Sequence, residues 1–203
     1  MFKDLKIRAK ASFAAAIVIF STLNFLPAFA VQSKVTSQSI SGNNVNLDTD
    51  LYLPSKLPAP AILLAHGFGG SKDSTADEAK KLQDLGYVVM TYSARGFGKS
   101  TGLISMNNYD LEVADAKNLV DFLAANKDVA RDKQGQPLIG VTGASYGGAL
   151  SLMLAAKDSR IKAVASDITW SSLRNALFPQ YANSSKYVSA AGPFKRVWAG
   201  SFF

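Results

Sequence analysis

A serine flanked by glycines is the residue of this sequence best suited to nucleophilic chemistry. The segment Gly143-Ala144-Ser145-Tyr146-Gly147 follows a short apolar stretch and precedes a run of small and apolar residues. In a nucleophile elbow, the serine sits in a strained turn between a strand and a helix, so residues two places before and after it must be small. The same pattern occurs in ordinary turns, but here the strand-like and helix-like neighbours favour the elbow. We therefore predict that Ser145 is a catalytic nucleophile and that Gly143 and Gly147 support its turn.

A second glycine-rich segment, His66-Gly67-Phe68-Gly69-Gly70, follows another apolar run. A backbone amide can approach an oxyanion closely only where side chains are absent, as they are at glycines. We expect the Phe68 amide to be an oxyanion donor and Gly67 to support it. His66 is a candidate general base, but its place at a strand end favours a structural histidine that orients the loop.

The segment Arg95-Gly96-Phe97-Gly98-Lys99-Ser100-Thr101-Gly102 looks like a phosphate-binding P-loop. Ser93 stands where that motif requires its first glycine, and the motif runs into glycine rather than into a helix. We therefore expect a shaped loop without a nucleotide, in which Arg95 forms a structural ion pair with Asp110 or Asp115. One histidine and no cysteine leave no metal-ligand spacing, and we expect no cofactor.

Alternating strand-like and helix-like segments must position these residues. Short apolar runs indicate buried strands, and apolar residues at helical intervals indicate amphipathic helices. The order predicts an α/β fold with a mostly parallel sheet, helices on both faces and an N-terminal antiparallel hairpin. The expected hairpin spans 34–53 with its turn at 41–44, the other strands lie at 59–65, 87–92, 138–141 and 161–166, and the helices lie at 74–85, 109–125 and 147–157.

The first thirty residues have the order of a secretory signal peptide. Four basic residues precede an apolar run, and Pro27-Ala28-Phe29-Ala30 offers the small residues of a cleavage site. An uncleaved membrane anchor is the alternative, which the polar residues and the proline within the run disfavour. We expect residues 1–30 to be removed, 31–175 to form the core of the fold, and 176–203 to begin a cap or lid or to form an irregular tail. The mature protein is then secreted or periplasmic, with no stable membrane span.

Composition excludes several other classes of protein. The chain has 203 residues, 48% of them hydrophobic and 18% charged, as in one packed domain. The absence of cysteine excludes a disulfide scaffold. The leader holds four basic residues and one acid, so the net charge of +7 falls to +4 in the mature chain. Without a basic cluster, nucleic-acid binding has no support.

Taken together, these motifs resemble a known family. The HGFGG, RGFGKSTG and GASYGG segments, with a helix carrying Glu112 and Asp115, look like the alpha/beta-hydrolase superfamily. The Ser145-Tyr146 pair is similar to the Xaa-Pro dipeptidyl-peptidase-like (S15-type) branch, which also includes cocaine-esterase-like acylases. The resemblance covers residues 34–175 and implies a serine hydrolase that forms an acyl-enzyme on Ser145. It also implies that the Tyr146 amide is the other oxyanion donor.

The sequence departs from this family in two respects. The branch often has a tyrosine where Phe68 stands, so we expect a hydrolase of esters or amides of a small-molecule or peptide substrate rather than a proline-directed peptidase. The family also places its triad acid and histidine after the nucleophile, each at a later strand end. No histidine follows Ser145, and Asp167 is a weak candidate for the acid. Two hypotheses remain: an incomplete serine hydrolase that is inactive by itself, or a non-catalytic binding protein that lacks the base.

Overall fold

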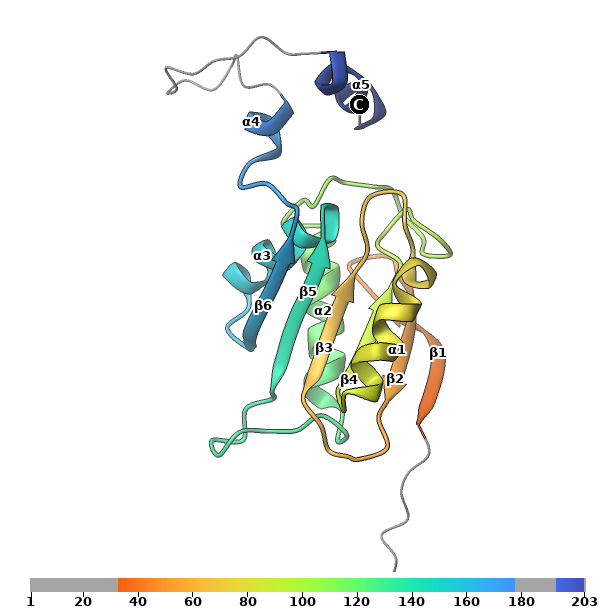
Figure 1. Ribbon diagram of the computed structural model, residues 1–203, viewed down its shortest axis with the longest axis vertical. Helices are drawn as coiled ribbons and strands as arrows, with labels where there is room; N and C mark the ends of the chain where they lie inside the picture. Colours follow the sequence, from red (N-terminus) through yellow and green to blue (C-terminus); the bar gives the residue numbers. More distant parts are fainter. Residues whose placement is uncertain (1–32, 178–192, 203) are drawn as a thin grey trace, which may run out of the picture.

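The computed structural model describes residues 33–177 and 193–202, so the expected signal peptide and much of the expected tail lie outside the described residues (Figure 1). Among these residues the strands are β1 (Lys34–Ser41), β2 (Asn46–Leu53), β3 (Ala61–Ala65), β4 (Val88–Tyr92), β5 (Ile139–Ala144) and β6 (Ile161–Asp167). The helices are α1 (Ala76–Asp84), α2 (Glu112–Ala125), α3 (Tyr146–Lys157), α4 (Leu173–Leu177) and α5 (Pro193–Phe202), and a 3-10 turn, η1 (Lys72–Thr75), precedes α1.

All six strands form one sheet in the order β1-β2-β4-β3-β5-β6. The first two strands pair antiparallel as a hairpin, and β2 also pairs antiparallel with β4. From β4 through β3 and β5 to β6 every pairing is parallel. The predicted α/β class, mostly parallel sheet and N-terminal hairpin are confirmed. Because parallel strands end at the same edge, the glycine-rich loops after β3 and β5 meet there.

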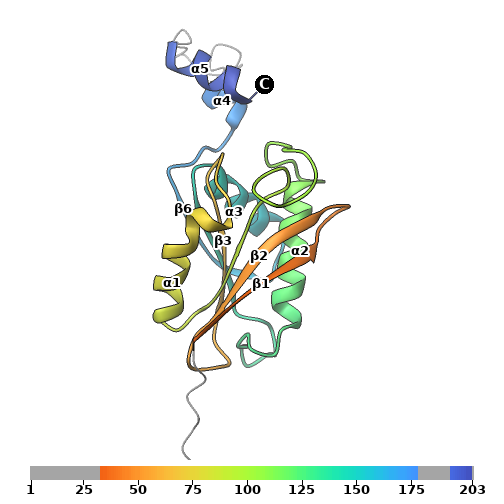
Figure 2. The same ribbon diagram turned by 90° about the vertical axis from the view of Figure 1, so that its right-hand side faces the viewer.

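Helices cover the sheet on both faces, although unequally (Figures 1 and 2). On one face, α1 packs over Leu64 and Val89. On the other face, α2 and α3 bury the larger part of the core, which includes Leu63, Met90 and Val141. This burial holds the central strands in place and leaves β6 at one edge of the sheet.

Several boundaries differ from those that the sequence pattern predicts. Helix α2 begins at Glu112 rather than at 109, because residues 106–111 form turns, and Tyr109 is exposed instead of packing on the helix face. Strand β5 continues to Ala144, three residues further than its apolar run. Pro193, which interrupts the sequence pattern, is the first residue of α5, a position where proline's missing N–H costs no hydrogen bond.

The described residues of the expected tail, 176–177 and 193–202, are helical. Helix α4 contacts α5, and both lie beyond the carboxyl ends of the parallel strands (Figures 1 and 2). No helix within 33–177 or 193–202 is long and apolar enough to cross a bilayer. The apolar run of the predicted leader lies outside the described residues.

Candidate active site

Ser145 occupies the turn between β5 and α3, with a backbone conformation that L-residues rarely adopt. Its φ is 54° and its ψ is −115°, a strained combination that neighbouring structure must hold in place. The Ser145 amide donates to the carbonyl of Asp167 at 2.9 Å, and its carbonyl accepts from the Thr169 hydroxyl at 2.9 Å. The strained turn is thus fixed to the end of β6.

The glycines around Ser145 are required by close backbone packing. A Cβ built on Gly143 would lie 2.7 Å from the carbonyl oxygen of Ala65, and one on Gly147 would clash with the same oxygen more severely. A Cβ on Gly148 would lie 2.9 Å from the Asp167 carbonyl. No real Cβ approaches backbone so closely, so the elbow can seat against the ends of β3 and β6 only with glycine at these positions.

The Ser145 side chain is partly exposed and is available for chemistry. Among the residues that the structure describes, none hydrogen-bonds to its hydroxyl. Tyr146 is the first residue of α3, a position where the amide has no acceptor within the helix. Together with the positive end of the helix dipole, this arrangement favours negative charge beside the hydroxyl.

His66 is buried beneath this site and uses both ring nitrogens. Its Nε2 accepts from the Ala94 amide at 3.0 Å, so the proton resides on Nδ1, which donates to the Gly67 carbonyl at 2.7 Å. Burial lowers the pKa of His66 below its ordinary value, although the hydrogen bond to Gly67 opposes this shift. The histidine joins the loop after β3 to the loop after β4 and has no free nitrogen with which to accept a proton from Ser145.

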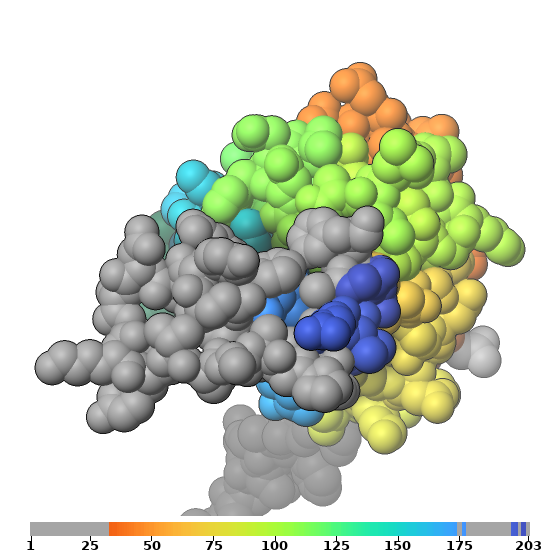
Figure 3. All heavy atoms as spheres, turned by 90° about the horizontal axis from the view of Figure 1, so that it is seen from above, coloured from red at the N-terminus to blue at the C-terminus, as the bar shows by residue number. Residues whose placement is uncertain are grey.

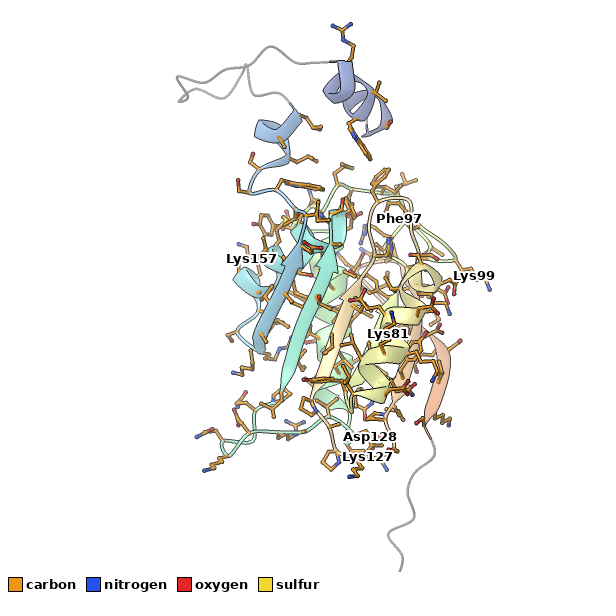
Figure 4. The ribbon with its side chains drawn as sticks, in the orientation of Figure 1. Lys81, Phe97, Lys99, Lys127, Asp128 and Lys157 are labelled. Atoms are coloured by element: carbon orange, nitrogen blue, oxygen red, sulfur yellow. The ribbon has the colours of Figure 1, made fainter. Side chains whose placement is uncertain are left out.

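The loop after β3 lies directly beside the elbow. A Cβ on Gly67 would lie 3.9 Å from the Ala144 carbonyl, so the two turns are neighbours. The Phe68 ring stacks edge-on against Tyr146, with ring centroids 5.5 Å apart, and against Phe97 at 5.4 Å. Figure 4 labels Phe97 at this end of the sheet, whereas Lys127 and Asp128 lie at the opposite end. These aromatic contacts set the position of the expected oxyanion loop.

Glu112 and Asn107 form a buried hydrogen-bond network behind the elbow. The sequence-based prediction did not assign these residues to the site. The Tyr146 hydroxyl donates to Glu112 Oε2 at 2.6 Å, and the Asn107 side chain donates to the Tyr146 carbonyl at 3.0 Å. The carboxylate also accepts from the amides of Asn107 and Ser105. Burial, followed by the hydrogen bond to Glu112, raises the pKa of Tyr146 above its ordinary value. The residue after Ser145 is thus held at both its ring and its backbone.

A tyrosine next to the serine and an acid at the start of a helix were visible in the sequence. The pairing itself was not, because residues 107, 112 and 146 meet only through the loop that precedes α2. That loop carries positive φ at Met106 and Asn107, which no sequence pattern indicated.

The RGFGKSTG loop is anchored as a structural element. Arg95 forms two hydrogen bonds to Asp115, from Nε at 2.7 Å and from a terminal nitrogen at 2.9 Å, so its partner is Asp115 and not Asp110. The Ser100 hydroxyl donates to the Ser93 carbonyl at 2.6 Å and accepts from the Asp48 amide. The Ser100 hydroxyl and the Arg95 guanidinium therefore both have hydrogen-bond partners inside the fold. The loop is followed by turns and not by a helix.

Asp167, the weak candidate for the triad acid, lies at the end of β6. Its carbonyl accepts a hydrogen bond from the Ser145 amide, whereas its side chain is exposed.

Within the described residues, no group of three or more histidine, cysteine, aspartate or glutamate side chains could hold a metal ion. Figure 3 looks onto this end of the sheet and shows the segments after β3 (yellow) and β4 (green) beside each other at its rim.

Chemically, the arrangement combines an accessible hydroxyl on a strained turn, a helix N-terminus and a second glycine-rich loop. Such a constellation suits attack on a carbonyl carbon and stabilisation of the resulting oxyanion. Within the described residues no side chain contacts the Ser145 hydroxyl as a base.

Comparison with known proteins gives the same fold and a family. The family model described as X-Pro dipeptidyl-peptidase (S15 family) matches residues 42–190, well over half of the chain. The uncharacterized protein YcjY of Escherichia coli is 29% identical over 140 residues. The uncharacterized protein PA2218 of Pseudomonas aeruginosa is 28% identical over 144 residues.

Solved structures show the same fold. The crystal structure of the same Pseudomonas protein superposes with a TM-score of 0.63 at 23% identity, covering 86% of this chain and 52% of that one. The alpha/beta hydrolase GrgF from a Penicillium species gives a TM-score of 0.59 at 23% identity, covering 67% and 46% of the two chains. The expected alpha/beta-hydrolase fold is confirmed. In sequence, the matches cover 66% and 67% of this chain but only 44% of YcjY and 38% of PA2218.

Proposed function

Because the chain belongs to the X-Pro dipeptidyl-peptidase (S15) family of hydrolases, we propose that it is the nucleophile-bearing part of an exported serine hydrolase. Its substrates are esters or amides of a small molecule or peptide, which are cleaved through an acyl-enzyme on Ser145. The observation that carries the proposal is the backbone of Ser145. A φ of 54° at a non-glycine residue is costly, and an ordinary strand-to-helix turn has no need for it.

In the proposed reaction, the Ser145 hydroxyl attacks the substrate carbonyl and the oxygen of that carbonyl gains negative charge. The amides of Tyr146 and Phe68 donate to this oxyanion. The Tyr146 amide is supported by its place at the first turn of α3, and the Phe68 amide by the position of its loop beside Ala144. A backbone donor of this kind contributes on the order of a hundredfold or more in rate.

A base must remove the proton of Ser145, and the chain's single histidine cannot do so. Both ring nitrogens of His66 form hydrogen bonds. Rotating the ring would break these bonds, which join the loop after β3 to the loop after β4. We therefore propose that the base lies outside the 203 residues and that this chain alone reacts slowly. Asp167 remains a candidate for the acid on the strength of its strand-end position. Because both nitrogens of His66 are hydrogen-bonded, the chain lacks a free base, which favours the alternative function, an exported binding protein that keeps the pocket without catalysis.

A fluorophosphonate probe tests the proposal, because it reacts with activated serines. We expect weak labelling of the 203-residue chain, and strong labelling when it is joined to the part of the Pseudomonas relative that lies outside the matched region, since the match covers 38% of that protein. The Ser145→Ala variant of the joined protein is the control and should not label. If the joined, folded protein labels no faster than this control, the hydrolase proposal is wrong and the binding protein is favoured.

Export is the second part of the proposal and rests on the leader sequence. We expect cleavage after Ala30 and accumulation of the mature chain outside the cytoplasm. N-terminal sequencing of the protein from a bacterial host tests this directly. A chain that keeps Met1 and stays with the membrane fraction would instead support the uncleaved anchor.

A further inference from the structure

The first turn of α3, which carries the proposed oxyanion amide of Tyr146, has little rigidity of its own. Tyr146 is followed by Gly147 and Gly148, and glycine loses more conformational freedom in a helix than any other residue. The hydrogen bond that closes this turn runs from the Ala149 amide to the Ser145 carbonyl at 3.0 Å. The orientation of Tyr146 therefore depends on contacts from outside the helix.

Asn107 supplies such contacts from the loop before α2. Its side-chain amide donates to the Tyr146 carbonyl at 3.0 Å, and its backbone amide donates to the Tyr146 hydroxyl oxygen at 3.1 Å. Asn107 is 3% exposed, so water does not compete for these contacts. One residue thus contacts Tyr146 at both its backbone and its ring.

The position of Asn107 is itself fixed. Its φ is 58°, in the left-handed region that asparagine adopts more readily than most residues with a side chain. Its backbone amide and that of Ser105 both donate to the carboxylate of Glu112, which is the first residue of α2. The buried acid therefore holds the loop, and the loop presents the side chain of Asn107 to Tyr146.

The Tyr146 carbonyl does not need Asn107 in order to have a hydrogen-bond partner. Within an α-helix, a carbonyl accepts from the amide four residues further along, and its oxygen has a second lone pair for another donor. The added bond restricts rotation instead. Because the carbonyl and the amide of Tyr146 lie on either side of one Cα, holding the carbonyl limits how far the amide can turn.

We propose that Asn107 is a positioning residue that keeps the Tyr146 amide aimed at the substrate oxyanion, with Glu112 holding its loop. The inference rests on the proposed function, since it concerns the oxyanion donor of the same site. Oxyanion donors act only when they point in advance to the place where charge develops, and a displacement of about 1 Å can cost about a hundredfold in rate.

Asn107→Gly tests the proposal, because glycine adopts a positive φ without strain and keeps the backbone amide that Glu112 binds. The variant removes the side-chain bond to Tyr146. Asn44→Gly is the matched control, since Asn44 has the same φ of 58° and lies in the turn between β1 and β2. Asn107→Asp is a second variant, which keeps the shape of the side chain and the tolerance of positive φ but cannot donate.

The first measurement is the rate of fluorophosphonate labelling at Ser145 as a function of probe concentration, which separates probe binding from bond formation. We expect bond formation in both Asn107 variants to be about tenfold slower than in Asn44→Gly, with the half-saturating probe concentration unchanged. Partial unfolding would lower the fraction of protein that labels and not this rate constant. The comparison uses the 203-residue chain, or the joined protein if labelling of the chain is too slow to measure.

The second measurement does not depend on chemistry at Ser145. We expect the Ala149 amide to exchange with solvent about tenfold faster in Asn107→Gly than in Asn44→Gly, because the first turn of α3 opens more often. The amide of Val141 in the central strand β5 should exchange alike in both. Equal exchange of Ala149 in the two variants would overturn the proposal, and so would equal rates of bond formation.

These outcomes separate the two proposals. If the wild-type protein labels and the Asn107 variants form the bond as fast as the control, the role of Asn107 is refuted and the hydrolase stands. If neither the 203-residue chain nor the joined protein labels at Ser145, the hydrolase proposal fails and the role of Asn107 fails with it.

Discussion

The hydroxyl of Tyr146 donates to the buried carboxylate of Glu112 at 2.6 Å, which ties the residue after Ser145 to the start of α2. Glu112 and Tyr146 are each 2% exposed, and the sequence separates them by 34 residues. The contact links the proposed oxyanion amide to the loop that runs from the RGFGKSTG segment to α2.

Removing the phenol hydroxyl should therefore destabilise the protein. In Tyr146→Phe, the buried carboxylate of Glu112 loses one of its hydrogen-bond donors. We expect a loss of about 1–3 kcal/mol in the free energy of unfolding. Urea denaturation measures it. The control is Tyr109→Phe, an exposed ring near Lys157, which should change stability by less than about 0.5 kcal/mol. Equal midpoints for the two variants would contradict a stabilising role of the contact.

The ion pair of Arg95 and Asp115 should be worth far more than an exposed pair. Their side chains are 6% and 2% exposed, so Arg95→Ala leaves a buried carboxylate uncompensated, at a cost of about 3–5 kcal/mol. Lys80 and Asp84 on α1 form the matched control at 65% and 61% exposure, and Lys80→Ala should cost about 0.5 kcal/mol or less. Denaturant midpoints at low and high salt compare them. A small, salt-sensitive effect of Arg95→Ala would show that its pair is energetically a surface pair.

Acid should weaken the fold through His66. Its pKa is lowered in the folded chain, so below the unfolded value of about 6.5 the unfolded chain binds more protons. The contribution of His66 to stability is complete above that value and is lost as the pH falls toward the folded pKa. Because the chain has a single histidine, the imidazole signals in an NMR titration of the folded protein give the pKa of His66 directly. A midpoint at or above 6.5 would contradict the buried, neutral ring.

A methyl group at the elbow should be poorly tolerated. Gly147→Ala drives Cβ into the Ala65 carbonyl, and because backbone cannot move aside cheaply, we expect a loss of about 2–3 kcal/mol or failure to fold. Gly200→Ala in α5 is the control, since no atom lies within 4 Å of the added Cβ and alanine favours helix. Thermal melting of both variants gives the comparison. Were the two to melt alike, the close packing of the elbow on β3 would be refuted.

Local patterns in the sequence determined the helices and strands and their order along the chain. Apolar runs such as 59–65 and 87–92 indicated buried strands, and Gly143 and Gly147 indicated a tight turn around Ser145. Each of these signals depends on residues near in sequence, because burial on both faces and backbone clearance are local requirements. The same locality explains the misplaced start of α2, where Tyr109 has helical spacing but lies in a turn.

The tertiary structure alone decided which distant residues meet. It chose Asp115 over Asp110 for Arg95, joined Glu112 to Tyr146, and engaged both nitrogens of His66. It also showed that the face of β5 and β6 is bare, although their apolar and small residues read like any buried strand. Side-chain pairing and the covering of a face depend on how loops bring separate elements together. A pattern of neighbouring residues does not indicate which distant residues will be in contact.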